Sequence, residues 1–117
     1  MLSAHFRFHG HGGLKAVYRN GKTVRGPLMN LKYTNRPSAK SYRAAVVVSK
    51  KVHKSAVTRN RIRRRLYEII RQADSQLTTG KDLVITVFSE RTADIAAPEL
   101  KKMVEELLKK ATTTKNP

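Results

Sequence analysis

The feature that most constrains this chain is the placement of its charges. The first acidic residue is Glu68, whereas residues 1–67 hold seventeen lysines and arginines. The rest of the chain holds eight basic and eight acidic residues, so the net charge of +17 lies in the first part. Ion pairs within that part cannot neutralise these cations, so a folded chain must spread them over its surface. Such a surface indicates a polyanionic partner. Nucleic acid fits better than an anionic membrane, which would require an apolar helix face with aromatic anchors.

Length and composition suit one domain with one modest core. The chain has 117 residues, of which 39% are hydrophobic. It contains no cysteine, which excludes disulfides, thiolate catalysis and cysteine-ligated zinc. There is no apolar run of membrane-spanning length and no recognisable secretory leader, so we expect a cytoplasmic protein. We assign 1–117 to a single domain, with an irregular lead-in at 1–12 and a frayed tail at 112–117.

Residues 58–73 combine a helical apolar pattern with a high density of arginine. Isoleucine and leucine recur on one helix face, and six of the fifteen residues from Thr58 to Gln72 are arginine. Either Ser55 or Thr58 can cap the helix start. A solvated helix face normally mixes charges of both signs, but Glu68 is the only acid in this segment. We therefore predict a helix that docks through its isoleucines. Its outer row comprises Asn60, Arg64, Tyr67 and Arg71.

The segments around this helix have strand patterns. Residues 27–34 alternate, so that Met29, Leu31 and Tyr33 share one side and face the core. The continuous β-branched run at 43–49 predicts a central strand buried on both faces. Residues 82–89 have the same character and predict a further strand.

Two more helices complete the predicted order. Leu14, Val17 and Tyr18 have helical spacing, and the helix would end at the Asn20-Gly21 pair, which can take positive φ. An amphipathic helix is expected within 94–111. The order of elements predicts an α+β or α/β two-layer sandwich, with a small mixed sheet of about four strands and three helices.

The segment SKKVHKSAVTRNRIRRRLYEIIR, residues 49–71, resembles the signature of the bacterial ribonuclease P protein subunit. In that family an SKK strand end leads into a helix that begins with RNR and further basic residues. Residues 14–26 are similar to the family's first helix and turn, and residues 80–88 to a later strand. The resemblance implies an α/β sandwich in which the signature helix connects two parallel strands by a left-handed crossover.

The resemblance also implies a function. Proteins of this family bind a large catalytic RNA and the single-stranded 5′ leader of precursor tRNA, and the RNA with its Mg²⁺ ions removes the leader. We therefore expect an endoribonuclease subunit without catalytic side chains of its own and without a tightly bound metal. We also expect a monomeric protein, one per RNA.

The resemblance implies that residues at the matching motif positions of this sequence contact RNA as they do in the family. The catalytic RNA is expected to contact Arg59, Asn60, Arg61, Arg63, Arg64, Lys50 and Lys51. The leader is expected to contact Tyr18, Leu14, Lys32, Asn30, Asn60, Arg64 and Tyr67. The family favours aromatic residues that stack on unpaired bases, and Leu14 and Lys32 depart from this preference. At Lys32 a phosphate contact would replace stacking, which contributes about 1–3 kcal/mol per base.

Other functional classes fit the sequence less well. A structural RNA-binding protein, such as a ribosomal protein, shares the size and charge but not the SKK and RNR signature. A DNA-binding protein with a basic helix would need a zipper or a helix-turn-helix partner, whereas strands flank this helix. A paired-carboxylate nuclease site is poorly supported because no acid precedes Glu68. A metal site on His5, His9 and His11 lacks a nearby carboxylate.

Overall fold

The computed structural model describes residues 11–35, 42–73 and 80–113, which form three helices, a short 3-10 helix and four strands. The helical segments are α1 (His11–Asn20), α2 (Ala56–Gln72), η3 (Glu90–Ala93) and α3 (Ala97–Thr113). The strands are β1 (Lys22–Arg25), β2 (Met29–Asn35), β3 (Arg43–Val48) and β4 (Lys81–Val87). These elements confirm the predicted α+β class with three helices and a small mixed sheet.

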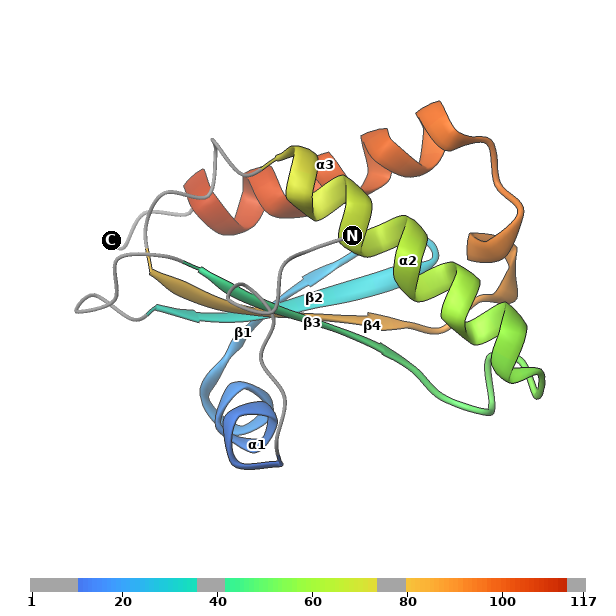
Figure 1. Cartoon of the computed structure of the whole chain (residues 1–117). Coiled ribbons are helices and arrows are strands. Elements are labelled where there is room, and N and C mark those ends of the chain that lie inside the picture. Colours follow the sequence, from blue (N-terminus) through green and yellow to red (C-terminus); the bar gives the residue numbers. More distant parts are fainter. Residues whose placement is uncertain (1–10, 36–41, 74–79, 114–117) are drawn as a thin grey trace.

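The strands lie in the order β1-β2-β4-β3. β2 is antiparallel to both β1 and β4, while β3 is parallel to β4 and reaches it through α2. Helices α2 and α3 cover one face of the sheet and α1 lies on the other (Figure 1). The prediction that 43–49 is a central strand is therefore wrong, because β3 is an edge strand. Its apolar run reflects the main core on one face and the small α1 cluster, which buries Ala45, on the other.

The main core lies between the sheet and the two helices α2 and α3. Met29, Leu31 and Tyr33 are buried in it, which confirms the predicted side of β2. α2 docks through the predicted apolar stripe, and α3 buries its own apolar face beside it. The stripe of α2 comprises Ile62, Leu66, Ile69 and Ile70. A second, small cluster lies on the opposite face, where Val17 of α1 packs against Ala45 and Val84.

Local contacts fix the helix ends. Ser55 caps α2, because its Oγ accepts a hydrogen bond from the backbone N–H of Thr58. α1 ends at Asn20 as predicted, but the reason is different. A Cβ on Gly21 would lie 2.4 Å from the backbone oxygen of Val17, so this glycine permits a close approach rather than a positive φ.

The predicted terminal segments are only partly tested. α1 begins at His11, inside the expected irregular lead-in, and α3 continues to Thr113, inside the expected tail. Residues 1–10 and 114–117 lie outside the described residues. Within the described ranges, no helix has the length and apolar character needed to cross a membrane.

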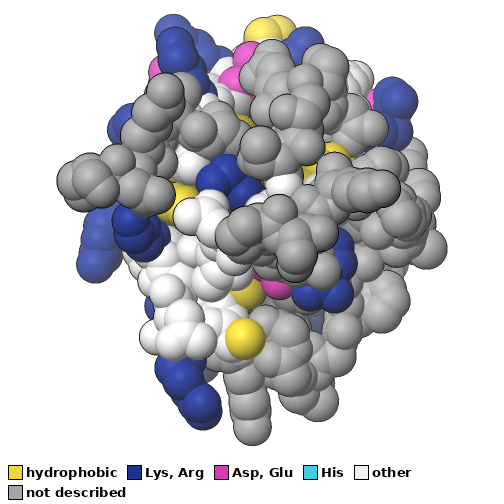
Figure 2. Space-filling view, turned by 90° about the vertical axis from the view of Figure 1, so that its left-hand side faces the viewer, with side chains coloured by type: hydrophobic (Ala, Val, Ile, Leu, Met, Phe, Trp, Pro, Cys, Tyr) yellow, Lys and Arg dark blue, Asp and Glu magenta, His cyan; other side chains and the backbone are white. Residues whose placement is uncertain are grey.

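Figure 2 shows lysine and arginine side chains in several places around one end of the molecule, with small acidic areas among them.

Candidate nucleic-acid interface

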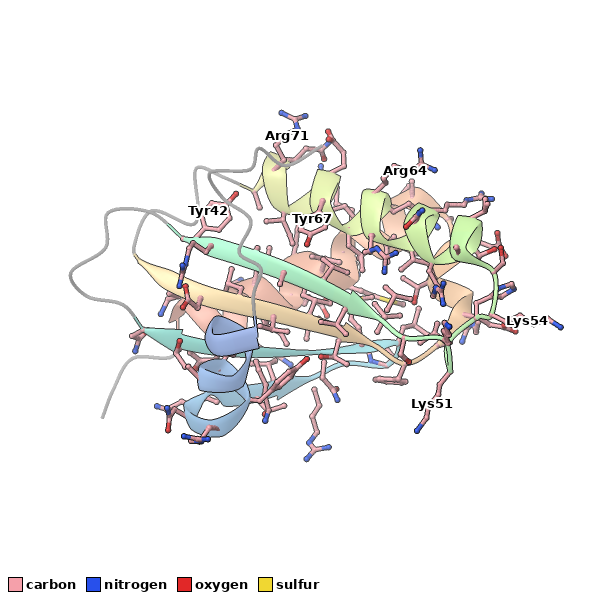
Figure 3. The ribbon with its side chains drawn as sticks, turned by 60° about the horizontal axis from the view of Figure 1, so that its bottom comes forward. Tyr42, Lys51, Lys54, Arg64, Tyr67 and Arg71 are labelled. Atoms are coloured by element: carbon pink, nitrogen blue, oxygen red, sulfur yellow. The ribbon has the colours of Figure 1, made fainter. Side chains whose placement is uncertain are left out.

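The outer surface of α2 presents arginines that the fold does not use. Arg64 is exposed and points away from the sheet (Figure 3), and no described residue forms a hydrogen bond or ion pair with its side chain. Nη2 of Arg61 lies 3.8 Å from Oδ1 of Asp94. Both side chains are well exposed, so this ion pair is weak. Arg59 is half-buried in the first turn of the same helix. The guanidinium groups of Arg64 and Arg61 can therefore donate paired hydrogen bonds to phosphates.

Other arginines of α2 have partners within the fold. Arg65 donates to the backbone oxygens of Thr92 and Ile95, at 2.9 and 2.5 Å, and so ties η3 and its following turn to α2. Arg63 donates to the backbone oxygen of Val48 at 3.5 Å and to Oδ1 of Asn60 at 2.5 Å. The predicted RNA contacts Arg63 and Asn60 are therefore already bonded to each other.

Arg71 pairs with Glu68 near the end of α2. Chiefly because of these hydrogen bonds from Arg71, the pKa of the Glu68 carboxyl is lowered to about 2. The single acid of the arginine segment thus stays ionised and holds the last arginine of the outer row. Arg64 lies one turn before Glu68, but the carboxylate bonds to Arg71, and no described residue forms an ion pair with Arg64.

Tyr67 was predicted to lie in the outer row of α2 and is instead buried. Its side chain is 8% exposed, and its hydroxyl accepts a hydrogen bond from the backbone N–H of Val46 at 3.0 Å (Figure 3). The cause is the edge position of β3. α2 lies over β3, which has no neighbouring strand on its outer side, so the backbone N–H of Val46 has no strand partner there. The side of α2 that carries Tyr67 therefore covers this N–H instead of facing solvent. The prediction of an exposed Tyr67 is wrong.

The SKK segment forms a tight turn after β3. Ser49 accepts from the backbone N–H groups of Val52 and Lys51, through its backbone oxygen at 3.0 Å and its Oγ at 3.3 Å. Lys50 and Lys51 are exposed, and Lys51 points away from α2 (Figure 3). Lys51 therefore faces a different side of the molecule from Arg64.

The face of the sheet on the α1 side is covered only in part. Strand pairing places residues in transverse rows, since directly paired residues point to the same face. The row under α1 includes Lys32, Val84 and Ala45. In the next row toward the SKK turn no side chain is buried. We call it the uncovered row, and it comprises Arg25, Asn30, Thr86 and Val47.

Tyr18 and Lys32 form the border between α1 and this row. Tyr18 is 41% exposed. Lys32 Nζ donates to the backbone oxygen of Tyr18 at 3.0 Å and lies 5.7 Å from the centre of its ring. A cation at this place stabilises the C-terminal end of α1 and contacts the aromatic face. Lys32 therefore positions Tyr18, and its expected phosphate contact stays a prediction.

The predicted leader residues fall into two separate groups. Tyr18, Lys32 and Asn30 lie together on the α1 side, whereas Asn60 and Arg64 lie on α2, across the sheet (Figure 1). The side chain of Leu14 lies outside the described residues. Sequence reasoning missed the two other polar members of the uncovered row, Arg25 and Thr86. Strand alternation could have placed Thr86, but only the register of β1 against β2 places Arg25.

A metal site would need several histidine or acidic side chains gathered in one place. Among the described residues, no group of three His, Asp or Glu side chains could hold a metal ion. His5 and His9, and the side chain of His11, lie outside the described residues.

The model of the Ribonuclease P family matches residues 2–112. The chain belongs to the ribonuclease P protein family. A ribonuclease P protein component from Synechococcus elongatus is 34% identical over 99 residues, covering 82% of this chain and 81% of the relative. One from Caldanaerobacter subterraneus is 41% identical over 96 residues, covering 82% and 80%. A third, from Pseudanabaena, is 46% identical over 71 residues, and this match spans 61% of each chain.

Solved structures share the fold. The chain is similar to the RNase P protein of Staphylococcus aureus, with a TM-score of 0.80 and 24% identity over 91% of this chain and 94% of that one. The RNase P protein of Thermotoga maritima gives a TM-score of 0.79 and 20% identity, over 89% and 96%. Family membership implies association with an endoribonuclease of tRNA processing and partnership with its RNA.

Proposed function

We propose that this protein is the ribonuclease P subunit that holds the catalytic RNA on α2 and the 5′ leader of precursor tRNA on the uncovered row. One observation carries the proposal. Two basic surfaces lie on opposite faces of one small sheet, and each has side chains that the fold leaves available. A protein built in this way can bind one polyanion on each side and fix their relative position.

On the α2 side, the exposed arginines bind phosphates. Arg64 is available without rearrangement, and Arg61 becomes available when its weak pair with Asp94 opens. Each phosphate neutralised releases condensed counterions, so assembly is strong at low salt and falls as salt rises. Lys50 and Lys51 lie outside this surface, in the turn after β3, and add a second cationic contact for RNA.

On the α1 side, the uncovered row takes the extended leader. Arg25 is exposed and can neutralise a phosphate, while Asn30 and Thr86 offer hydrogen bonds to sugars or base edges. The amide of Asn30 is held in place because its Oδ1 accepts a hydrogen bond from the backbone N–H of Gly26, at 3.4 Å. Tyr18, positioned by Lys32, provides a ring on which one unpaired base can stack.

The protein's contribution is binding and orientation of the precursor. Mg²⁺ held by the RNA partner and the substrate supplies the hydrolytic chemistry, as expected for the family. The residues of this chain hold the leader in one path relative to the RNA, which lowers the entropic cost of reaching the reactive geometry. We further propose a monomeric protein that acts in the cytoplasm, one copy per RNA.

The test is cleavage of a precursor tRNA at low Mg²⁺ by a bacterial ribonuclease P RNA, with and without the protein. We expect cleavage at the mature 5′ end only when both are present, and tighter binding of precursor than of mature tRNA. Cleavage by the protein alone would refute the assignment of catalysis to the RNA. Binding without any stimulation of cleavage would favour a structural RNA-binding protein instead.

A further inference from the structure

Phe88 is the most exposed aromatic side chain in the described part of the chain. It follows the last residue of β4 and is 52% exposed, although its neighbour Val87 is buried in the main core. Its backbone N–H donates to the oxygen of Leu28 at 3.1 Å, so the ladder between β4 and the segment before β2 continues to this residue. Leu28 precedes β2 and turns into the main core, so it does not set the direction of the ring. Val87 points into that core and side chains alternate along a strand, so the half-exposed ring of Phe88 points to the α1 side, next along β4 from Thr86 of the uncovered row. The fold leaves this large apolar ring in water.

The surroundings of Phe88 are polar and basic. Val87 pairs with Val48 of β3, so the exposed Lys50 and Lys51 follow at the same end of the sheet. Asn30 pairs with Thr86 and lies on the other flank. An isolated ring between hydrogen-bonding groups and lysines does not match a protein-binding patch, which would be broader and more apolar. It matches a site for single-stranded nucleic acid, where cations take the phosphates and an aromatic face takes the base.

We propose that Phe88 is a second stacking platform, which receives an unpaired base of the leader beyond the uncovered row. This inference rests on the proposed function. Tyr18 contacts Lys32, which pairs with Val84, and Val84 lies four residues before Phe88, or about 13 Å along the strand. The two rings therefore contact different nucleotides, with the uncovered row between them.

The experiment uses the holoenzyme assembled with a bacterial ribonuclease P RNA, and precursor tRNAs that carry 2-aminopurine at successive leader positions. Stacking on an aromatic ring quenches this fluorophore. We expect Phe88→Ala to relieve the quenching at one position and to weaken precursor binding roughly 5- to 100-fold. Phe88→Trp should retain both properties, and Tyr18→Ala should relieve quenching at a different position. Val57→Ala removes another exposed apolar side chain, 74% exposed on α2, and should change neither.

Several results would overturn the inference. Quenching that persists at every leader position in Phe88→Ala would do so, as would an equal weakening of precursor and mature tRNA binding. A tryptophan that fails to replace the phenylalanine would also count against stacking. A wild-type dimer that Phe88→Ala dissociates would assign the ring to self-association. Failure of the proposed function has a separate signature, because the unmodified protein would then not distinguish precursor from mature tRNA.

Discussion

The two faces of the sheet differ in how completely they are covered. Under α2 and α3, apolar side chains from all four strands pack into one core, and most of their surface is buried. Under α1 only the small cluster around Val17 is closed, and the next row of side chains is open. The first face supplies the stability that lets the second face stay open, because an uncovered row contributes little burial of its own.

The same division occurs between neighbouring residues of α2. Arg65 bonds to two backbone oxygens near η3, whereas Arg64 extends away from the protein. Residues adjacent in sequence point about 100° apart on a helix, so one can serve the fold and the next a partner. The following predictions test this division, first where stability should suffer most.

The largest effect is expected from Ile62→Asp, on the covered face. Ile62 is fully buried, so the variant would place an unpaired charge in the core. That cost is comparable with the whole stability of a small domain, about 5–15 kcal/mol, and we expect an unfolded chain. Circular dichroism against temperature measures it. Ile62→Val, which costs about 0.5–1.5 kcal/mol, is the matched control. A native spectrum for the aspartate variant would show that the core is not where we place it.

Alanine at each of the two neighbouring arginines should have opposite consequences. Arg65→Ala removes two charge-assisted hydrogen bonds, and we expect a loss of about 2–3 kcal/mol in the free energy of unfolding. Arg64→Ala should leave that free energy unchanged and lower the slope of log K against log salt for RNA binding by about one unit. Urea titration and salt-dependent binding measure the two quantities. An unchanged slope for Arg64→Ala would remove this residue from the interface.

Tyr67→Phe should lower stability without affecting RNA. The variant keeps the ring but leaves the buried N–H of Val46 without its acceptor, which costs about 1–2 kcal/mol. Urea unfolding gives the stability, and filter binding gives the affinity for the catalytic RNA. The converse outcome, normal stability with weaker RNA binding, would return Tyr67 to the interface.

The smallest effect is expected from Glu68. Its pKa is lowered from 4.5 to about 2 in the folded protein, so its ion pair contributes stability that is fully present above pH 4.5. This contribution should disappear as the pH falls from 4.5 toward 2. Glu68→Gln should therefore make the stability of the protein less dependent on pH in that window. Identical pH profiles for the two proteins would show that the pair with Arg71 has no effect on folding.

Much of the fold could be predicted from local patterns. The stripe of α2, the cap at Ser55 and the alternation in β2 depend on neighbouring residues, and the structure confirms all three. The edge position of β3 could not be predicted, because an apolar run shows that both faces are covered but not which strands lie alongside. The burial of Tyr67 follows from that edge and was missed for the same reason.

The candidate site was predictable to a smaller extent. The arginine density indicated the partner, and strand parity placed Asn30 and Lys32 on the face of the strand opposite Met29 and Leu31. Arg65 forms hydrogen bonds within the fold because η3 and the turn after it lie beside α2. η3 is short and has no periodic pattern, so this role of Arg65 could not be predicted. The uncovered row requires the register between strands, which single-sequence patterns do not contain.

The hydrogen bond between Tyr67 and Val46 has a consequence for the protein before it meets its RNA. A sheet of four strands has two edges, and an unpaired edge can recruit a strand from another molecule. The β1 edge is short and carries exposed Lys22 and Arg25, so like charges repel a second copy. The β3 edge is apolar, and there the helix and its tyrosine occupy the place a foreign strand would take. We therefore expect both edges of the free subunit to resist strand addition by a second molecule, even before RNA is bound.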